Sequence, residues 1–140
     1  MTLRVPTAWE SSFEDSDTLV FAAADVTDQW ETVEAELRNA FDLSQDAARS
    51  GHPIVYVVHN DDLLGRRGAG KAMVATGLLS AARSAALELA KAGVPVNMLA
   101  IDDTTDPGAV ARWVVTLSEH ATPTGELIHL GSGHVGKALA

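Results

Sequence analysis

Cysteine is absent from this sequence, and basic residues are few. Without cysteine, the chain has no disulfide scaffold, no cysteine nucleophile and no thiolate metal site. Ten Lys and Arg residues stand against nineteen Asp and Glu residues, which gives a formal charge of −9. A surface that binds nucleic acid or anionic lipid needs a basic face, so this charge balance argues against both kinds of partner.

Long apolar runs are lacking as well. No stretch reaches the roughly twenty apolar residues that a membrane helix requires, and residues 1–10 contain no apolar core of a signal peptide. We therefore expect a cytoplasmic protein. The 140 residues, 46% apolar and 21% charged, fit a single globular domain over 1–140. Residues 1–16 show no clear pattern and are expected to be an N-terminal extension, in which residues 3–5 are candidates for a short strand.

Apolar runs of strand length alternate with helical patterns along the rest of the chain. Continuous apolar runs predict buried strands, and apolar residues three or four apart predict helices. The predicted strands are 18–24, 53–58, 94–101 and 126–130, and the predicted helices are 28–50, 72–92 and one that begins at 107. This order predicts an α/β fold in three layers, a four-stranded parallel sheet with right-handed crossovers and helices on both faces.

The helix predicted over 28–50 has start signals and one apolar face. Thr27 or Asp28 can cap it, with Glu31 where a capping box requires an acidic residue. The apolar face consists of residues three or four apart: Trp30, Val33, Leu37, Phe41, Ser44 and Ala48. The helix predicted from 107 has Asp106 as its candidate N-cap and Pro107 at its first position.

The helix predicted over 72–92 is almost uncharged. Between Lys71 and Lys91, Arg83 and Glu88 are its only charged residues. A helix that is apolar nearly all round is buried on more than one side, and its small residues permit close approach of a neighbour. We therefore expect the helices 28–50 and 72–92 to form a subunit interface. The residues expected there are Phe41, Leu43, Leu78, Ala81, Ala82 and Ala85.

Five segments, in one order and with compatible spacing, resemble motifs of the short-chain dehydrogenase/reductase family. Residues 17–24 (DTLVFAAA) resemble the family's DxLVNNAG strand, and residues 41–45 (FDLSQ) resemble its helix segment F-x-L-T-Q. Residues 51–55 (GHPIV) and 87–97 (LELAKAGVPVN) resemble GxGxIV and L-A-x-E-L…G-I-x-V-N. Residues 124–133 (TGELIHLGSG) resemble TGxxIxVDGG. The resemblance implies the second half of a Rossmann-like domain.

The family's catalytic and cofactor-binding residues are replaced in this chain. The resemblance begins at what would be the family's fourth strand, without the glycine-rich turn that binds the dinucleotide pyrophosphate. By alignment, the catalytic Tyr-x-x-x-Lys falls on Lys71 and Ala75, the active-site serine on His59 and the helix asparagine on Glu36. The resemblance therefore implies no catalytic residue and no cofactor-binding residue at these four positions. We expect no cofactor in the isolated chain.

Two functions of different class follow from the resemblance. The first is a non-catalytic pseudo-subunit that assembles with itself or with a full-length reductase, because the family's main subunit interface uses the helices that correspond to 28–50 and 72–92. The second is a subunit of an NAD(P)-dependent short-chain oxidoreductase. In it, a partner chain supplies the NAD(P) site, or a new site forms at His59 and Lys71.

Two further patterns could indicate a phosphate site or a metal site, and each also fits an ordinary loop. Residues 65–71 match G-x-x-x-x-G-K, a phosphate-binding loop, but Ala72 cannot ligate magnesium. We favour a flexible loop with a solvated Lys71.

Acidic residues and a histidine are expected at the carboxyl edge of the sheet: Asp25, His59, Asp61, Asp62, Asp102 and Asp103. Their spacing fits no metal motif, and no Ser or Cys nucleophile accompanies His59, so we favour turn-forming roles and predict no metal site.

The predicted strand 18–24 needs a neighbour on its outer edge. In the family this strand lies beside the first strand of the fold, which the resemblance does not cover. An unpaired buried-type edge favours aggregation. We therefore predict that either residues 3–5 or another chain pairs with it.

Overall fold

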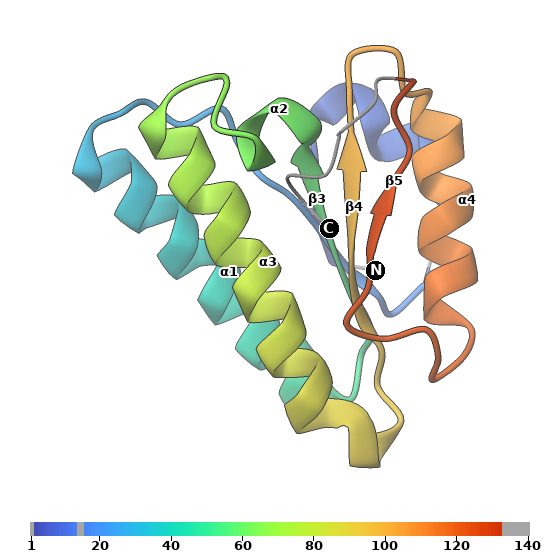
Figure 1. Ribbon diagram of the computed structural model, residues 1–140. Helices are drawn as coiled ribbons and strands as arrows, with labels where there is room; N and C mark the ends of the chain where they lie inside the picture. Colours follow the sequence, from blue (N-terminus) through green and yellow to red (C-terminus); the bar gives the residue numbers. More distant parts are fainter. Residues whose placement is uncertain (1, 14–15, 133–140) are drawn as a thin grey trace.

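The computed structural model describes residues 2–13 and 16–132 (Figure 1), so the last glycine of the glycine-rich segment 131–133 lies outside the described part. The strands are β1 (Thr2–Arg4), β2 (Leu19–Ala22), β3 (Ile54–His59), β4 (Val96–Ile101) and β5 (Leu127–His129). The helices are α1 (Trp30–Ser50), α2 (Asn60–Leu63), α3 (Ala69–Leu89) and α4 (Pro107–Ser118), with 3₁₀ turns η1 (Thr7–Ser12) and η2 (Ala90–Ala92).

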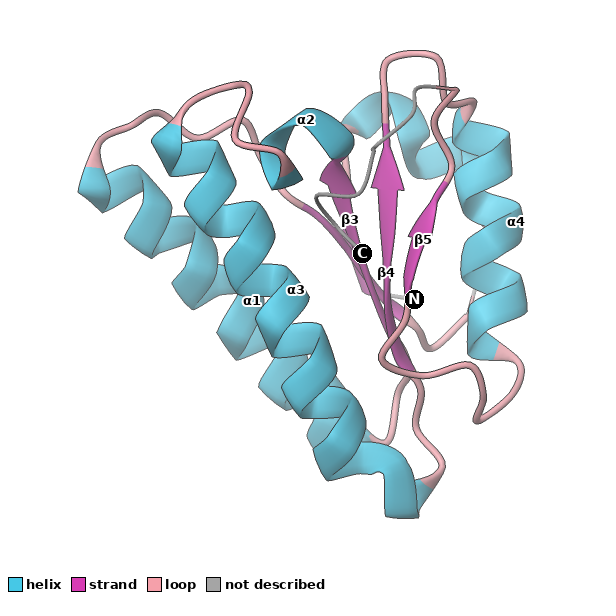
Figure 2. Ribbon diagram, in the orientation of Figure 1, coloured by secondary structure: helices cyan, strands magenta, loops and turns pink. Residues whose placement is uncertain are grey.

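The sheet is parallel throughout and has the strand order β1-β2-β3-β4-β5. It has five strands rather than the predicted four, because the N-terminal segment adds β1 beside β2, with Leu3 opposite Val20. The prediction that the extension pairs with the edge of strand 18–24 is therefore confirmed, one residue earlier in the chain than expected. The α/β fold and the three layers are also confirmed (Figure 2).

Two apolar clusters lie on opposite faces of the sheet. Leu19, Phe21, Ile54 and Tyr56 point to the face that α1 and α3 cover. The alternate strand residues Val20, Val55 and Val57 point to the other face, which α4 and η1 cover. Side chains alternate between the faces of a strand, so strands buried on both sides are apolar on both faces, as the sequence predicted; within β4 the buried Asn97 is polar and bonds to the chain around Pro123 and Glu126.

The last crossover departs from the right-handed rule that the sequence pattern suggested. The strand order advances in one direction from β2 to β5, and the first two crossovers, through α1 and α3, use the same face. Helix α4 lies on the opposite face (Figure 1), so the β4–α4–β5 connection has the opposite hand. In this position Val110, Val114 and Leu117 cover apolar strand residues that α1 and α3 cannot reach.

Helix α1 is rotated relative to the predicted apolar face. Val33, Glu36, Ala40 and Ala47 are its buried residues. Two of the predicted face residues, Trp30 and Phe41, are instead 56% and 61% exposed. The predicted apolar face was wrong for Trp30 and Phe41, because the carboxylate of Glu36 occupies one of the buried positions of the helix. Glu36 accepts hydrogen bonds from Arg4 (2.8 Å) and from the backbone N–H of Ala24.

The predicted caps have different outcomes at the two helices. Asp106 is the N-cap residue of α4, with Pro107 in the first turn as predicted, although its side chain forms no cap bond. Gln29 takes the N-cap position of α1 instead of Thr27 or Asp28, and it forms no side-chain cap bond. Asp28 acts instead at the start of α3, where its carboxylate accepts the N–H of Gly70 at 2.8 Å. The loop before α1 lies against the first turn of α3, so a carboxylate expected to cap one helix caps its neighbour.

Candidate functional site

The carboxyl ends of β2, β3 and β4 border a groove with a volume of 490 Å³. Its apolar walls include Pro6 and Trp9 from the N-terminal segment. Five of the six polar residues expected at this edge line it: Asp25, His59, Asp62, Asp102 and Asp103. In open α/β sheets, ligands bind at this edge. The groove is therefore the candidate site.

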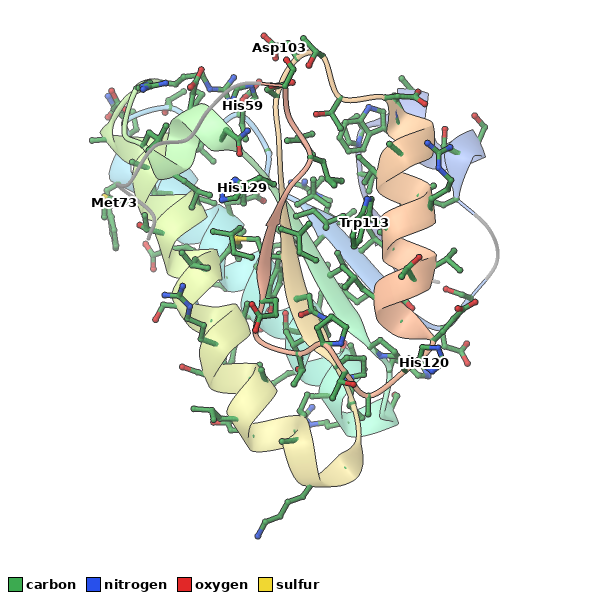
Figure 3. The ribbon with its side chains drawn as sticks, turned by 45° about the vertical axis from the view of Figure 1, so that its right-hand side comes forward. His59, Met73, Asp103, Trp113, His120 and His129 are labelled. Carbon is green, nitrogen blue, oxygen red and sulfur yellow. The ribbon has the colours of Figure 1, made fainter. Side chains whose placement is uncertain are left out.

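His59 connects the end of β3 to α2 and the loop after β4. Its Nδ1 accepts the backbone N–H of Asp61 at 3.1 Å, and its Nε2 lies 3.1 Å from Oδ1 of Asp103 (Figure 3). Since Nδ1 accepts, the proton of the neutral ring is on Nε2 and is donated to Asp103. Both ring nitrogens thus have a hydrogen-bond partner in the structure.

Arg67 lines the groove, and carboxylates neutralise its charge. Its Nε and Nη2 donate to the two oxygens of Asp62, each at 2.8 Å, and Nη2 also donates to Asp25 at 3.2 Å. The hydrogen bond to Asp62 raises the pKa of Arg67 above its ordinary value, although partial burial acts in the opposite direction. A bidentate pair of this kind holds the guanidinium in one orientation, so Arg67 orders the loop and offers little charge to an anionic ligand.

The glycine-rich segment 65–71 bends back onto the loop before α1. Lys71 donates from Nζ to the carbonyl of Val26 at 2.9 Å, so it is not solvated as expected. A Cβ on Gly70 would lie 2.2 Å from the carbonyl oxygen of Thr27, so only glycine fits there. Because Asp28 already accepts the N–H of Gly70 in the first turn of α3, the segment does not present the open nest of N–H groups that phosphate binding requires.

A second polar cluster lies beside the groove. His129 Nδ1 is 3.1 Å from Oδ1 of the buried Asn60, and burial lowers the pKa of His129. Asp102 accepts from the backbone N–H and the hydroxyl of Thr104 at 2.8 and 2.6 Å. The side chains of Asp102 and Asn60 both lie against Gly131. These bonds join the ends of β3, β4 and β5 into one ordered edge.

The positions that align with the family's catalytic residues do not come together in one site. Glu36 is bound to Arg4 on the α1 side, Lys71 contacts Val26, and Ala75 is 1% exposed in the core. Lys71 does not line the groove with His59, and its Nζ is bound to the carbonyl of Val26. Tyr56 is 2% exposed in the middle of β3, where its hydroxyl bonds to Ser44 at 2.6 Å and burial raises its pKa.

Sequence reasoning missed Pro6, Trp9 and Arg67 as residues of the groove. Residues 1–16 gave no periodic signal, so nothing indicated that Pro6 and Trp9 would reach the carboxyl edge. The pairing of Arg67 with Asp62 links α2 to the turn before α3 with a spacing of five residues, which matches no motif. Across residues 2–13 and 16–132, no group of three or more His, Asp or Glu residues is arranged to hold a metal ion.

The expected interface residues divide into two groups. Phe41 is 61% exposed, Ala81 is exposed, and Leu43 and Ala85 are half-buried. Leu78 and Ala82 are 2% and 1% exposed, and they belong to the core between α3 and the sheet. The interface expectation was wrong for these two, because the same face of α3 cannot cover the sheet and meet another subunit.

No family model matches the sequence, and a search of curated proteins finds no relative. Solved structures with the same fold include several oxidoreductases. The enoyl-[acyl-carrier-protein] reductase (NADH) of Aquifex aeolicus superposes with a TM-score of 0.70 at 16% identity, over 84% of this chain and 61% of its own. The acetoin dehydrogenase of Enterobacter cloacae gives a TM-score of 0.71 at 21% identity, over 84% and 63%.

A short-chain dehydrogenase/reductase of Serratia marcescens gives a TM-score of 0.67 at 20% identity, over 84% of this chain and 65% of its own. The chain therefore has the Rossmann-like fold of short-chain dehydrogenases/reductases, and it spans less than two thirds of the length of these three proteins. The fold expected from the motif resemblance is confirmed. None of the helices in the described part of the chain combines the length and hydropathy of a membrane span.

Proposed function

We propose that this chain is a non-catalytic subunit with the fold of short-chain reductases, which assembles with itself or with a full-length reductase through the outer face of α1 and α3. One observation carries the proposal. Of the five large hydrophobic side chains that are exposed in the described residues, four lie on these two helices: Trp30, Phe41, Met73 and Leu87. Exposed apolar side chains on two neighbouring helices favour a protein interface there.

The candidate groove supports the non-catalytic part of the proposal. Proton transfer needs a group with a free lone pair or a labile proton within hydrogen-bond reach of the substrate. His59 has both nitrogens engaged, Arg67 is paired with two carboxylates, and Lys71 is bound to a carbonyl. The hydrogen bonds of these side chains hold the loops around the groove in place. These three described residues therefore supply no acid or base that is ready to act.

Dinucleotide binding tests this proposal directly. We expect calorimetric titration of the isolated chain with NADH, and separately with NADPH, to show no binding, because the described part of the chain has no glycine-rich turn of the kind that brings backbone N–H groups to a pyrophosphate. A full-length short-chain reductase titrated in parallel is the positive control. A micromolar dissociation constant, about −8 kcal/mol, would contradict the proposal.

The second candidate is a subunit that completes the cofactor site of a partner chain. The 490 Å³ groove at the carboxyl edge favours it, since ligands of such sheets bind there. In a complex purified with a reductase partner, this candidate predicts that Trp9→Ala changes the KM for the dinucleotide or substrate. The non-catalytic subunit predicts unchanged kinetics, with Glu10→Ala as the exposed control on the same turn.

A further inference from the structure

A cavity of 330 Å³ lies between α1 and α3, and we call it the α1–α3 cavity. The two helices run side by side over one face of the sheet (Figure 2). Ile54 and Tyr56 of β3 form the floor of the cavity, and both side chains are buried. Cavities of about 300–1,000 Å³ with mainly apolar walls are typical binding sites for small molecules.

Small residues on both helices leave this space open. In a packed interior, side chains interdigitate and rarely leave voids larger than a water molecule. The walls of the α1–α3 cavity instead carry small residues: Ala40, Ser44 and Ala48 on α1, and Gly77, Ala81 and Ala85 on α3.

The cavity is elongated along the helices and closed at one end. Gly77 faces Leu37 so closely that a Cβ on the glycine would lie 3.2 Å from Leu37 Cδ2. These are the first lining residues of the two helices, so their contact closes the end nearest the helix N-termini. From Gly77 to Glu88, the rise of 1.5 Å per residue gives a length of about 17 Å. A zigzag carbon chain advances about 1.25 Å per C–C bond, so about ten carbons and a head group fit.

The walls favour an apolar occupant. The hydroxyl groups of Ser44 and Tyr56 bond to each other at 2.6 Å, so an apolar occupant leaves neither hydroxyl without a partner. Phe41 lines the cavity and is 61% exposed. An alkyl chain in the cavity would remove apolar surface of these walls from water, and this removal favours binding.

The charge at the cavity is negative. Of the described residues that line it, Glu88 is the only charged one, and it is exposed at the end opposite Leu37. Arg49 lies near the same end, on α1, but it donates to Gln45 at 3.4 Å and lies 3.9 Å from Asp46. A carboxylate therefore already offsets its charge. A cationic head group at this end meets an opposite charge at Glu88, whereas a carboxylate head group meets a like charge.

From these features we propose that the α1–α3 cavity binds one alkyl chain of about ten carbons, with the chain between the two helices and an ammonium head group at Glu88. This inference goes beyond the proposed function and does not depend on it. The walls and the floor of the cavity all belong to one copy of the chain, so binding requires no partner.

Calorimetric titration of the isolated chain with alkylammonium ions tests the proposal. We expect one site per chain, with decylammonium bound about 15-fold more tightly than octylammonium, because each buried CH₂ group strengthens binding about fourfold. Decanoate should bind more weakly than decylammonium. An absence of binding, an affinity that is independent of chain length, or tighter binding of decanoate would overturn the proposal.

Two leucine substitutions locate the site. Ala85 is half-buried and lines the cavity, so Ala85→Leu should occupy the space and weaken decylammonium binding at least tenfold, the factor that the loss of two buried CH₂ groups produces. Ala35→Leu is the control, because Ala35 is exposed on α1 and does not line the cavity. Circular dichroism verifies that both variants fold. Equal affinity in both variants and the natural chain would indicate adsorption to the acidic surface and overturn the proposal.

An exchange of charge tests the position of the head group. We expect Glu88→Lys to lower the affinity for decylammonium about tenfold and to raise the affinity for decanoate, because an exposed attraction becomes a repulsion of similar size. Glu119→Lys changes the net charge equally at the end of α4, on the opposite face of the sheet, and should change neither affinity. Equal effects of the two substitutions would overturn the assignment to Glu88. NADH binding is measured separately, so a failure of this inference is distinguishable from a failure of the proposed function.

Discussion

Arg4 shows how single residues hold the N-terminal strand in place. Its guanidinium donates to Glu36 at 2.8 Å and to the carbonyl of Ala22 at 3.2 Å, and it lies 5.4 Å above the ring of Phe21. Glu36 is only 5% exposed. A buried carboxylate is tolerated when it is paired and hydrogen-bonded, and it becomes costly when its partner is removed. These contacts tie β1 to β2 and α1.

Replacing Arg4 should therefore cost more than replacing an exposed arginine. We expect Arg4→Ala to lower the free energy of unfolding by about 2–3 kcal/mol, because the carboxylate of Glu36 loses its charge partner. Arg38→Ala is the control: Arg38 pairs with Glu34 on the outer side of the same helix, 2.8 Å away, and such pairs contribute about 0.3–0.5 kcal/mol. Urea unfolding measures both, and equal losses would contradict a special role for the Arg4 contact.

Among the elements, α3 depends most on small residues. Its first turn lies so close to the loop before α1 that Gly70 has no room for a side chain, and its middle turns border a cavity of 330 Å³ between α1 and α3 at Gly77 and Ala81. The two glycines differ in what limits them. The neighbour of Gly70 is the backbone carbonyl of Thr27, whereas the neighbour of Gly77 is the flexible end of Leu37.

The same substitution at these two glycines should therefore have opposite effects. We expect Gly70→Ala to destabilise the fold by about 2 kcal/mol or more, because a backbone segment must move and the Asp28 cap is disturbed. Gly77→Ala should be neutral or stabilise the fold by up to about 1 kcal/mol, since alanine favours a helix interior and Leu37 can shift. Thermal unfolding of both variants is the measurement. A harmless Gly70→Ala would show that the loop is not packed against α3 as described.

At the scale of the whole molecule, β1 covers the outer edge of β2 and becomes an edge strand of the sheet. The segment that contains β1 also places Trp9 and Phe13 in the apolar cluster with α4, on the face opposite α1 and α3. Without this segment, β2 would present an unpaired apolar edge and part of one face would lose its cover. The segment is thus an integral layer of the domain rather than an extension.

Removal of residues 1–13 should therefore cause aggregation. We expect the truncated chain to scatter light and to lose cooperative unfolding, because the exposed edge of β2 can pair with other chains. Glu10→Ala, an exposed substitution within η1, should leave both properties unchanged. A truncated chain that stays soluble and unfolds cooperatively would show that β1 is not needed for the fold.

The local pattern of the sequence was sufficient to determine the α/β class, three of the helices, the four strands β2 to β5 and the gathering of Asp25, His59 and Asp103 at one edge of the sheet. Continuous apolar runs and helical spacing are local signals, and a parallel sheet necessarily brings the carboxyl ends of its strands together. The expectation of a strand partner for residues 18–24 also came from such a run.

Only the tertiary structure decided the parts that depend on contacts between distant residues. It rotated α1 so that Phe41 became exposed, because Glu36 pairs with Arg4 across 32 positions of sequence. Asp28 accepts a hydrogen bond at the start of α3 instead of α1. The β4–α4–β5 crossover has the opposite hand from the predicted one, and this hand places α4 on the second face of the sheet, which it covers. Apolar periodicity indicates that one face of a helix is buried, whereas packing decides which residues lie on that face and what they contact.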